Sequence, residues 1–350
     1  MPDPLHEKSR RSGPHFRRPR IGFVGVGWIG RHRLKSAAEC GAAEIVALSD
    51  SAEDALQAAA AHAPGAVLVA DLEALLRLEL DGVVIATPTA LHADQAIACL
   101  GSGLAVFCQK PLGRTAPETA RVITAAKASD RLLAVDMCYR FVRAVLKVKD
   151  LARSGEVGEI YACDLDFHNA YGPDRPWYYN PKLSGGGCII DLGIHLVDLL
   201  LWLLDFPRIE NVSSRRFARG RPLEPGDPAL EDFALARIDF VTGATATLSC
   251  SWKLPAGKDA VIGARFFGTR GGLAVANVGG SFYDFRAERY HGTATEVLDE
   301  PPDAWGGRAL EAWMRRLAQR PGFDPEIERT QIVAAVIDAM YGRDARFLPV

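Results

Sequence analysis

The sequence lacks any C-x-x-C pair, although seven cysteines occur among its 350 residues. Such pairs are typical of structural zinc sites, and an even set of cysteines is typical of secreted domains held by disulfides. An odd, scattered set instead indicates free thiols in a reducing compartment. We therefore expect a cytoplasmic protein, and no His, Glu or Cys spacing in the chain predicts a metal site.

An excess of charge of one sign is also absent, because the chain has 41 Lys and Arg and 43 Asp and Glu, for a net charge of −2. This balance argues against binding to nucleic acid or to an anionic membrane surface. No apolar run reaches the length of a transmembrane helix, since the richest, 189–204, contains Asp191, His195 and Asp198. We expect neither a nucleic acid nor a membrane as partner.

The chain is too long for one hydrophobic core, so two domains are expected. The first residues differ from the rest, because they are rich in Arg, Pro and His. Arg10-Arg11 resembles the start of a twin-arginine export signal, but no hydrophobic region follows it. We predict a disordered tail over 1–19, a first domain over 20–138 and a second domain over 139–350.

Short apolar segments alternate with helix-compatible segments from residue 20 to about 136. The apolar segments are continuous runs of Val, Ile, Leu and Ala, which is typical of strands buried on both faces. The alternation predicts a Rossmann domain with a doubly wound parallel sheet. The expected strands are 21–24, 44–48, 66–69, 82–86, 104–107 and 132–135, and the expected helices are 29–39, 53–61, 72–78, 92–100 and 117–129.

The second half has longer segments of strand character. In 244–252, Thr and Ser alternate with Ala, Leu, Cys and Trp, and this period of two indicates a half-buried antiparallel strand. We predict an α+β domain with an open, largely antiparallel sheet and helices on one face. The other face needs cover, which predicts a homodimer or homotetramer. The expected strands are 160–167, 211–217, 233–240, 244–252, 264–267 and 273–278, and the expected helices are 141–153, 189–204, 309–319 and 325–341.

A glycine motif, G-x-G-x-x-G, follows the first strand directly. Gly25 allows a tight turn, Gly27 lets the backbone approach a pyrophosphate, and Gly30 lets the next helix pack closely. The phosphates would lie at the helix N-terminus, where free N–H groups favour an anion. Asp50 ends the second strand, twenty residues after Gly30, where an acidic residue binds the ribose of NAD. A plain strand–helix corner is the alternative, which the combined features disfavour.

Two further strand ends lie where ligands bind in parallel sheets. Lys110 follows the strand 104–107, and its ammonium can stabilise a developing alkoxide. A solvated surface role is the alternative for Lys110 and for His92. Asp50 would repel the 2′-phosphate of NADP, so NAD is the expected cofactor and NADP the less favoured one. The expected cofactor-binding residues are Gly25, Gly27, Trp28, Ile29, Gly30, Asp50, Ser51, Thr87, Pro88, His92, Gln109 and Lys110.

A polar pair interrupts the apolar helix 189–204. His195 follows Asp191 by four positions, so the two would share one face of a regular helix. Asp198 lies near the same stripe. Buried among apolar neighbours, these groups must find partners. A histidine held by a carboxylate suits general acid–base catalysis near neutral pH. A purely structural Asp–His pair is the alternative.

These motifs together resemble the Gfo/Idh/MocA oxidoreductase family, which includes inositol, glucose and other sugar dehydrogenases. The resemblance covers residue 20 to the C-terminus and implies a Rossmann domain followed by an open-sheet domain that often mediates dimers or tetramers. It also implies a catalytic set of Lys110, Asp191 and His195. One departure is Gln109, because the family usually has Glu before Lys-Pro. Without this glutamate carboxylate, an attraction that favours the charged form of Lys110 is absent. The motifs are the glycine turn, Thr87-Pro88…His92, Lys110-Pro111 and G-G-G…D-x-G-x-H-x-x-D over 185–198.

The expected activity is hydride transfer between the nicotinamide of NAD(P) and a secondary alcohol or ketone of a sugar, sugar acid or inositol. Aromatic faces with scattered polar groups suit such a polyol, and arginines would accept a carboxylate or phosphate on it. A non-catalytic NAD(P)-binding regulator and an NAD-dependent glycosidase-like hydrolase are the alternatives. The expected substrate-binding residues are Lys110, Arg140, His168, Trp177, Tyr179, Asp191 and His195.

Overall fold

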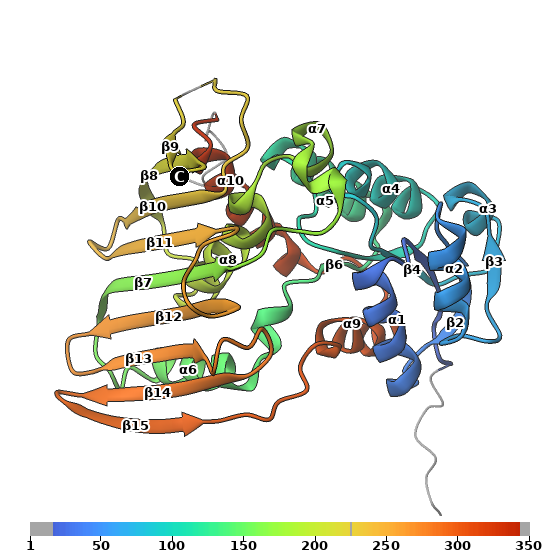
Figure 1. Cartoon of the computed structure of the whole chain (residues 1–350). Coiled ribbons are helices and arrows are strands. Elements are labelled where there is room, and N and C mark those ends of the chain that lie inside the picture. Colours follow the sequence, from blue (N-terminus) through green and yellow to red (C-terminus); the bar gives the residue numbers. More distant parts are fainter. Residues whose placement is uncertain (1–16, 225, 344–350) are drawn as a thin grey trace, which may run out of the picture.

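The computed structural model describes residues 17–224 and 226–343, so most of the predicted tail, residues 1–16, lies outside the described residues. The described chain forms two bodies, each built on one sheet (Figure 1). The first sheet has the order β3-β2-β1-β4-β5-β6 with parallel pairings, which confirms the predicted Rossmann fold. Its strands are β1 (Arg20–Val24), β2 (Glu44–Ser49), β3 (Val67–Val69), β4 (Gly82–Ile85), β5 (Ala105–Cys108) and β6 (Leu133–Val135).

Helices pack on both faces of this sheet, because successive strand residues point to opposite sides. Phe23 and Val84 belong to one core, and their neighbours Val24 and Val83 belong to the other. Because both faces of each strand are buried, the strands are continuous apolar runs, and such runs allow them to be predicted from the sequence. The helices are α1 (Trp28–Cys40) and α2 (Glu53–Ala60) on the first core, and α3 (Leu72–Leu76), α4 (Thr89–Gly101) and α5 (Ala116–Ser129) on the second.

A helix from the end of the chain, α9 (Arg308–Gln319), completes the first core. Its Trp313 ring lies 5.8 Å from the ring of Phe107 on β5, and Leu310 and Met314 are fully buried beside it. In Figure 1, α9 lies next to α1, far in sequence but adjacent in space. The core of the first sheet therefore includes a segment that follows the whole second sheet in sequence.

The second sheet has nine strands in the order β15-β14-β13-β12-β7-β11-β10-β8-β9 within the described residues. Its pairings are antiparallel except for that of β11 with β7, which confirms the predicted largely antiparallel sheet. The sequence did not indicate β9, β14 and β15, because β9 has only two residues and because charged residues interrupt the apolar pattern of β14 and of the edge strand β15. The strands are β7 (Ile160–Asn169), β8 (Ile209–Ala218), β9 (Arg221–Pro222), β10 (Phe233–Phe240), β11 (Thr245–Ser251), β12 (Ala260–Gly268), β13 (Gly272–Asn277), β14 (Phe285–His291) and β15 (Ala294–Asp299).

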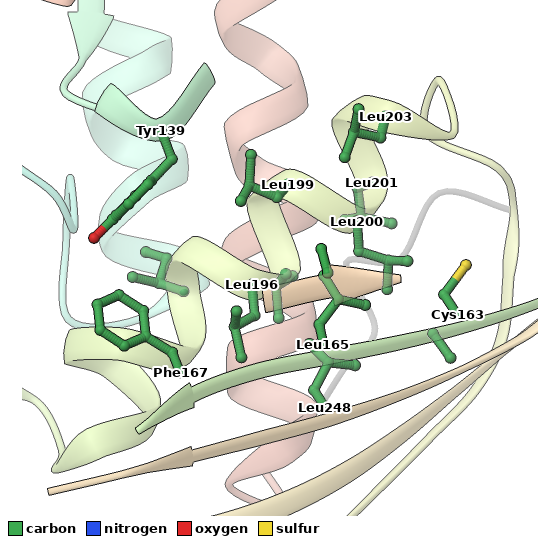
Figure 2. Packing of buried hydrophobic residues seen from close by; sticks show 14 of the residues in the cluster. Tyr139, Cys163, Leu165, Phe167, Leu196, Leu199, Leu200, Leu201, Leu203 and Leu248 are labelled. Carbon is green, nitrogen blue, oxygen red and sulfur yellow. The ribbon is translucent and has the colours of Figure 1, made fainter. Parts of the chain in front are cut away.

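One face of this sheet is covered by α6 (Arg143–Ser154), α8 (Ile194–Leu203) and α10 (Arg329–Met340). Figure 2 shows Leu165 and Phe167 on the side of β7 that faces α8, where Leu196 of α8 also lies. The helical stretch Pro181–Leu203 has the length and apolar character of a membrane span, but 89% of its richest window is buried inside the protein. It is therefore the central core helix of the second body.

The opposite face of the second sheet is polar. Arg265 donates to Asp164 over 2.6 Å, and Thr247 donates to the same carboxylate over 2.8 Å. The alternation predicted for 244–252 is confirmed, since Leu248 and Cys250 are buried whereas Thr247 is exposed. No element among the described residues covers this face, and its hydrogen-bonded side chains make it compatible with water as well as with a partner.

Candidate active site

A cavity of about 780 Å³ lies at the carboxyl ends of the parallel strands and extends to the second body. It is lined by the loops after β1, β2, β4, β5 and β6 and by the segment that carries Asp191 and His195. Carboxyl ends of strands in an open parallel sheet are the usual place for a ligand. The cavity brings together these predicted site residues: Gly25, Gly27, Trp28, Ile29, Asp50, Ser51, Thr87, Pro88, His92, Gln109, Lys110, Trp177, Asp191 and His195.

Each of the three glycines of the motif has a different conformation or different surroundings that suit a residue without a side chain. Gly25 has φ +82°, and a Cβ there would lie 2.6 Å from the Ala86 carbonyl group. A Cβ on Gly30 would lie 2.1 Å from the Gly25 oxygen. The glycine therefore lets α1 pack closely on the turn, and Gly30 does not line the cavity. Gly27, at the start of α1, has open space around its Cβ position. This combination fits a pyrophosphate at the N-terminus of α1.

Asp50 anchors the edge of the cavity beside this turn. Its Oδ2 accepts a hydrogen bond from the backbone N–H of Val26 (2.7 Å), and Oδ1 accepts one from Ala52 (2.9 Å). Each carboxylate oxygen keeps a further lone pair for a ribose hydroxyl. Trp28 is 59% exposed at the cavity wall, and its ring stacks on His32. The residues present therefore fit the adenosine half of a dinucleotide.

His92 connects two loops of the cavity instead of facing solvent. Its Nδ1 lies 2.7 Å from the Pro111 carbonyl oxygen, and its Nε2 lies 2.7 Å from the Thr87 carbonyl oxygen. The side chain is almost fully buried, and this burial lowers the pKa of His92. His92 thus holds the loop after β4 against the loop that carries Lys110.

Lys110 and Asp191 form an ion pair between the two bodies. The Lys110 Nζ donates to the Asp191 Oδ1 (2.8 Å) and also to the Asp191 carbonyl oxygen (2.6 Å). The second carboxylate oxygen, Oδ2, accepts a hydrogen bond from Trp252 Nε1 (3.0 Å). Both charged side chains are mostly buried at the cavity, so the pair holds the ammonium at a defined position.

His195 lies at the cavity with a neutral imidazole. The residue is 7% exposed, and its ring meets the Tyr139 ring edge-on at 4.8 Å. Burial, and then the positive charge of Lys110, hold the pKa of His195 well below its ordinary 6.5. A neutral histidine at pH 7 is in the form that can accept a proton.

The expectation that Asp191 holds His195 is wrong. Asp191 gives its carboxylate to Lys110 and Trp252, and the segment Ile189–Gly193 is a π-helical turn rather than regular α-helix. The Asp191 carboxylate is satisfied by donors from two other segments, the loop after β5 and the residue after β11. The two side chains therefore act at the same cavity without pairing.

Three predicted substrate residues lie away from this cavity. Arg140 donates from Nε to Asp198 Oδ2 (2.8 Å), and this ion pair packs on Trp202. His168 points to the polar face of the second sheet, where its ring nitrogens lie 2.9 Å and 3.0 Å from the hydroxyls of Ser251 and Ser249. Tyr179 packs on Trp252 beside a separate surface cavity. None of these three lines the cavity that contains Lys110.

The segment before Asp191 is held by Glu231. This carboxylate accepts hydrogen bonds from the N–H of Gly187 (2.9 Å), the N–H of Ile189 (3.0 Å) and the hydroxyl of Tyr341 (2.6 Å). A Cβ at position 187 would lie 2.0 Å from the Glu231 carbonyl oxygen, so the glycine is needed for this approach. Full burial raises the pKa of Glu231. The Gly-rich loop therefore sets the position of Asp191.

Several cavity residues were not identified from the sequence. Asp136 had a usable signal, because it directly follows β6 just as Asp50 directly follows β2. Trp252, which binds Asp191 without lining this cavity, had a weaker signal as the end of the alternating strand. Arg33 lies on α1, and most of the other missed residues come from loops distant in sequence that no local pattern marks. Among these are Asn169, Tyr171, Asp174, Phe282, Tyr283 and Trp305.

A glycine turn on a Rossmann sheet, a Lys–Asp pair and a neutral histidine at one cavity define a two-domain, dinucleotide-binding oxidoreductase. Residues 19–137 match the family described as an oxidoreductase family with an NAD-binding Rossmann fold, and residues 145–274 match the GFO/IDH/MocA C-terminal domain. The chain belongs to the Gfo/Idh/MocA family, which confirms the predicted family and enzyme class.

Similar proteins support this assignment over most of the chain. D-glucoside 3-dehydrogenase of Escherichia coli (strain K12) is 26% identical over 337 residues, 92% of this chain and 94% of that protein. A protein of Amycolatopsis mediterranei (strain S699), provisionally named a UDP-kanosamine synthase oxidoreductase subunit, is 33% identical over 248 residues, 67% and 68% of the two chains.

Solved structures share the fold at lower identity. Levoglucosan dehydrogenase in complex with NADH and L-sorbose has a TM-score of 0.80 and 20% identity, covering 95% of this chain and 99% of that chain. A 3-ketoreductase from Actinomadura kijaniata in complex with NADP has a TM-score of 0.81 and 20% identity, covering 94% and 99%. Both complete chains follow the same two-body architecture.

Proposed function

We propose that this protein is an NAD-dependent dehydrogenase that acts on a secondary alcohol of a sugar, sugar acid or inositol. The observation that carries the proposal is a neutral, buried His195 at the same cavity as the Lys110–Asp191 pair and the glycine turn. The names of similar proteins support the substrate class, since they include D-glucoside 3-dehydrogenase and inositol 2-dehydrogenase.

His195, Lys110 and Asp191 have different roles in the proposed reaction. Neutral His195 removes the proton from the substrate hydroxyl, because its low pKa keeps an acceptor nitrogen free at neutral pH. Lys110 donates to the same substrate oxygen and stabilises the developing alkoxide. Asp191 positions Lys110 through the 2.8 Å ion pair, and Trp252 in turn fixes Asp191. A bound nicotinamide would supply the hydride acceptor.

The proposed cofactor preference is NAD. Both oxygens of Asp50 accept backbone hydrogen bonds, so the carboxylate is held in place at the ribose end of the cavity. A fixed negative charge there opposes a 2′-phosphate, and the adjacent Ser51 and Ala52 carry no positive charge to offset it. Similar solved structures include complexes with NAD, NADH and NADP, so the choice rests on Asp50.

The substrate half of the cavity is rich in aromatic side chains. Trp177 and Tyr178 stack at 3.8 Å between ring centroids, and Tyr139 and Trp305 lie together on another wall. Flat apolar rings pack against the C–H faces of a sugar ring, whereas hydroxyls need separate polar partners. Arg175 also lines the cavity and could pair with an acidic group on the substrate.

Turnover with a panel of polyols tests the proposal. Purified protein should reduce NAD to NADH with at least one sugar, sugar acid or inositol, and the productive compound should raise the melting temperature when NAD is present. Release of a leaving alcohol without net NADH would instead indicate a hydrolase. Tight NAD binding without turnover on any member of the panel would indicate a regulator.

We further propose that the protein is a cytoplasmic homodimer or homotetramer. The seven cysteines are all free, which suits a reducing compartment. The uncovered face of the nine-stranded sheet is the proposed contact, since it exposes Leu235 and Phe267 among its polar side chains.

A further inference from the structure

Two exposed tyrosines line the cavity on the side of the second body. Tyr171 follows β7 and is 56% exposed, and Tyr283 precedes β14 and is 49% exposed. Among the described residues, the other exposed large apolar side chains of this cavity are Trp28 and Leu91, which belong to the first body. A ligand that removed the two tyrosine rings from water would gain free energy from this contact.

The two tyrosines come from neighbouring loops at one end of the nine-stranded sheet. The loop after β7 is hydrogen-bonded to the residue before β12, since the N–H of Ala170 donates to the Asp259 carbonyl oxygen (2.9 Å). The start of β12 is bonded in turn to the loop between β13 and β14, since the N–H of Ala260 donates to the Gly280 carbonyl oxygen (3.2 Å). Figure 1 shows these strand ends on the side of the sheet that faces the first body.

Protein contacts hold both tyrosines in position. The Tyr171 hydroxyl donates to Asp259 Oδ1, which fixes the hydroxyl end of that ring. Trp305 Nε1 donates to the Tyr283 carbonyl oxygen (2.8 Å), which fixes the backbone that carries the second ring. These contacts leave about half of each tyrosine exposed. Side chains that are already ordered lose less conformational entropy when a ligand packs on them.

A row of aromatic rings connects the reacting centre with Tyr283. The Tyr139 ring lies 4.8 Å from the His195 ring, and the Trp305 ring lies 5.2 Å from the Tyr139 ring. The Tyr283 ring follows at 6.2 Å from Trp305. Tyr139 and Trp305 are buried, whereas Tyr283 is exposed. A substituent on a sugar bound at His195 would therefore find an apolar path from the reacting centre toward solvent.

The charges on this part of the wall favour a neutral substituent. Among the described residues, Arg175 is the only Lys or Arg that the second body contributes to the cavity lining, and its Nε lies 3.7 Å from Asp174 Oδ2. A multiply charged substituent such as a diphosphate would therefore meet little net positive charge. An aromatic group needs no such charge and is compatible with the exposed rings.

We propose that the substrate is a glycoside whose aglycone, the group attached to the sugar, is neutral and aromatic and packs on Tyr171 and Tyr283. The sugar itself lies at Lys110 and His195, as in the proposed reaction. Aromatic rings stack on tyrosine, and the apolar area removed from water adds to that contact. The inference rests on the proposed function and narrows its substrate class, since free sugars and inositols have no aglycone.

Steady-state kinetics with matched glycosides tests this assignment. Phenyl and methyl glycosides of glucose, galactose and mannose, each as both anomers, share a reacting sugar and differ only in the aglycone. For the sugar that the wild type oxidises with NAD, kcat/KM should be at least about 10-fold higher for the phenyl glycoside. The difference should lie in KM, because a contact away from the reacting carbon acts equally in the ground state and the transition state.

Variants at the two tyrosines should reduce the phenyl-to-methyl ratio of kcat/KM. Tyr171→Ala and Tyr283→Ala should each lower it, and the double variant should bring it within about 3-fold of unity, since the stacking contact is lost. Tyr161→Ala is the matched control, because Tyr161 is 54% exposed at the other end of β7, and it should keep the wild-type ratio. Each ratio compares two substrates in one preparation, so it does not depend on the folded fraction.

The possible failures of the inference and of the proposed function are distinguishable. Equal kcat/KM for phenyl and methyl glycosides, turnover confined to compounds without an aglycone, or an unchanged ratio in the double variant would overturn the inference alone. Absence of NAD binding, together with absence of turnover on every polyol, would overturn the proposed function as well.

Discussion

The Nζ of Lys110 lies 2.8 Å from Oδ1 of Asp191, although the two residues belong to different bodies and are 81 positions apart. Lys110 follows β5 of the Rossmann sheet, and Asp191 precedes the core helix of the second body. The ion pair therefore joins the two bodies at the cavity that both of them line. Since Trp252 binds the other oxygen of Asp191, the ammonium has one position from which to meet a substrate oxygen.

Replacement of His195 should stop proton transfer without removing the cofactor. His195→Gln should lower turnover about 10² to 10⁴-fold, the usual contribution of a general base, while NAD affinity by calorimetry stays within a few-fold. His168→Gln is the matched control, because His168 binds serine hydroxyls on the outer sheet face. A comparable loss of turnover in both variants would contradict the role of His195.

The pH dependence should follow the low pKa of His195. Because the base must be neutral, kcat/KM for oxidation should stay level through pH 7 and fall only below pH 6.5, as His195 gains a proton. Lys110→Met removes a positive charge that lowers this pKa, so the acidic limb should move to higher pH at a much reduced rate. A limb that stays fixed or moves lower in Lys110→Met would show that another group titrates.

Cofactor choice should depend on Asp50. The wild type should bind NAD more tightly than NADP, and Asp50→Ser should narrow the difference because it removes the fixed negative charge. The variant also loses acceptors for Val26 and Ala52, so its affinity for both cofactors should fall. Calorimetric titration of each protein with each cofactor measures this. Tighter binding of NADP by the wild type would refute the preference.

The indole N–H of Trp252 should contribute to stability and to turnover. Trp252→Phe keeps an aromatic ring but removes the donor to Asp191 Oδ2, so stability should drop by about 1 kcal/mol and turnover by up to about 10-fold. Trp177→Phe is the comparison, since the Trp177 ring stacks on Tyr178 at the same cavity. Thermal unfolding and steady-state rates give the two quantities. Unchanged turnover in Trp252→Phe would show that Asp191 keeps its position without this donor.

Assembly should depend on the uncovered sheet face. Light scattering at micromolar concentration should give the mass of a dimer or tetramer, and Leu235→Glu should shift it toward the monomer. Leu235 is 46% exposed on β10, so the change leaves the core intact. Leu146→Glu, at a 39% exposed position on α6, is the matched control and should keep the assembly. A monomeric wild type would contradict the expectation.

Local patterns were sufficient for the architecture. The continuous apolar strands, the glycine turn and the position of Asp50 are consequences of short-range geometry, since a strand, its turn and the next helix adjoin in sequence. The period of two in β11 likewise predicts which of its residues are buried. These features need no knowledge of distant residues, which is why the Rossmann sheet and the largely antiparallel second sheet agree with expectation.

The partners of the proposed catalytic side chains were decided only by the tertiary structure. Asp191 binds Lys110 and Trp252 instead of His195, because the loop after β5 brings an ammonium close and the end of β11 brings an indole N–H close. The low pKa of His195 has the same origin, since burial and charge depend on what packs around the ring. Sequence spacing specifies which side chains share an element, whereas hydrogen bonds and desolvation depend on elements that meet in space.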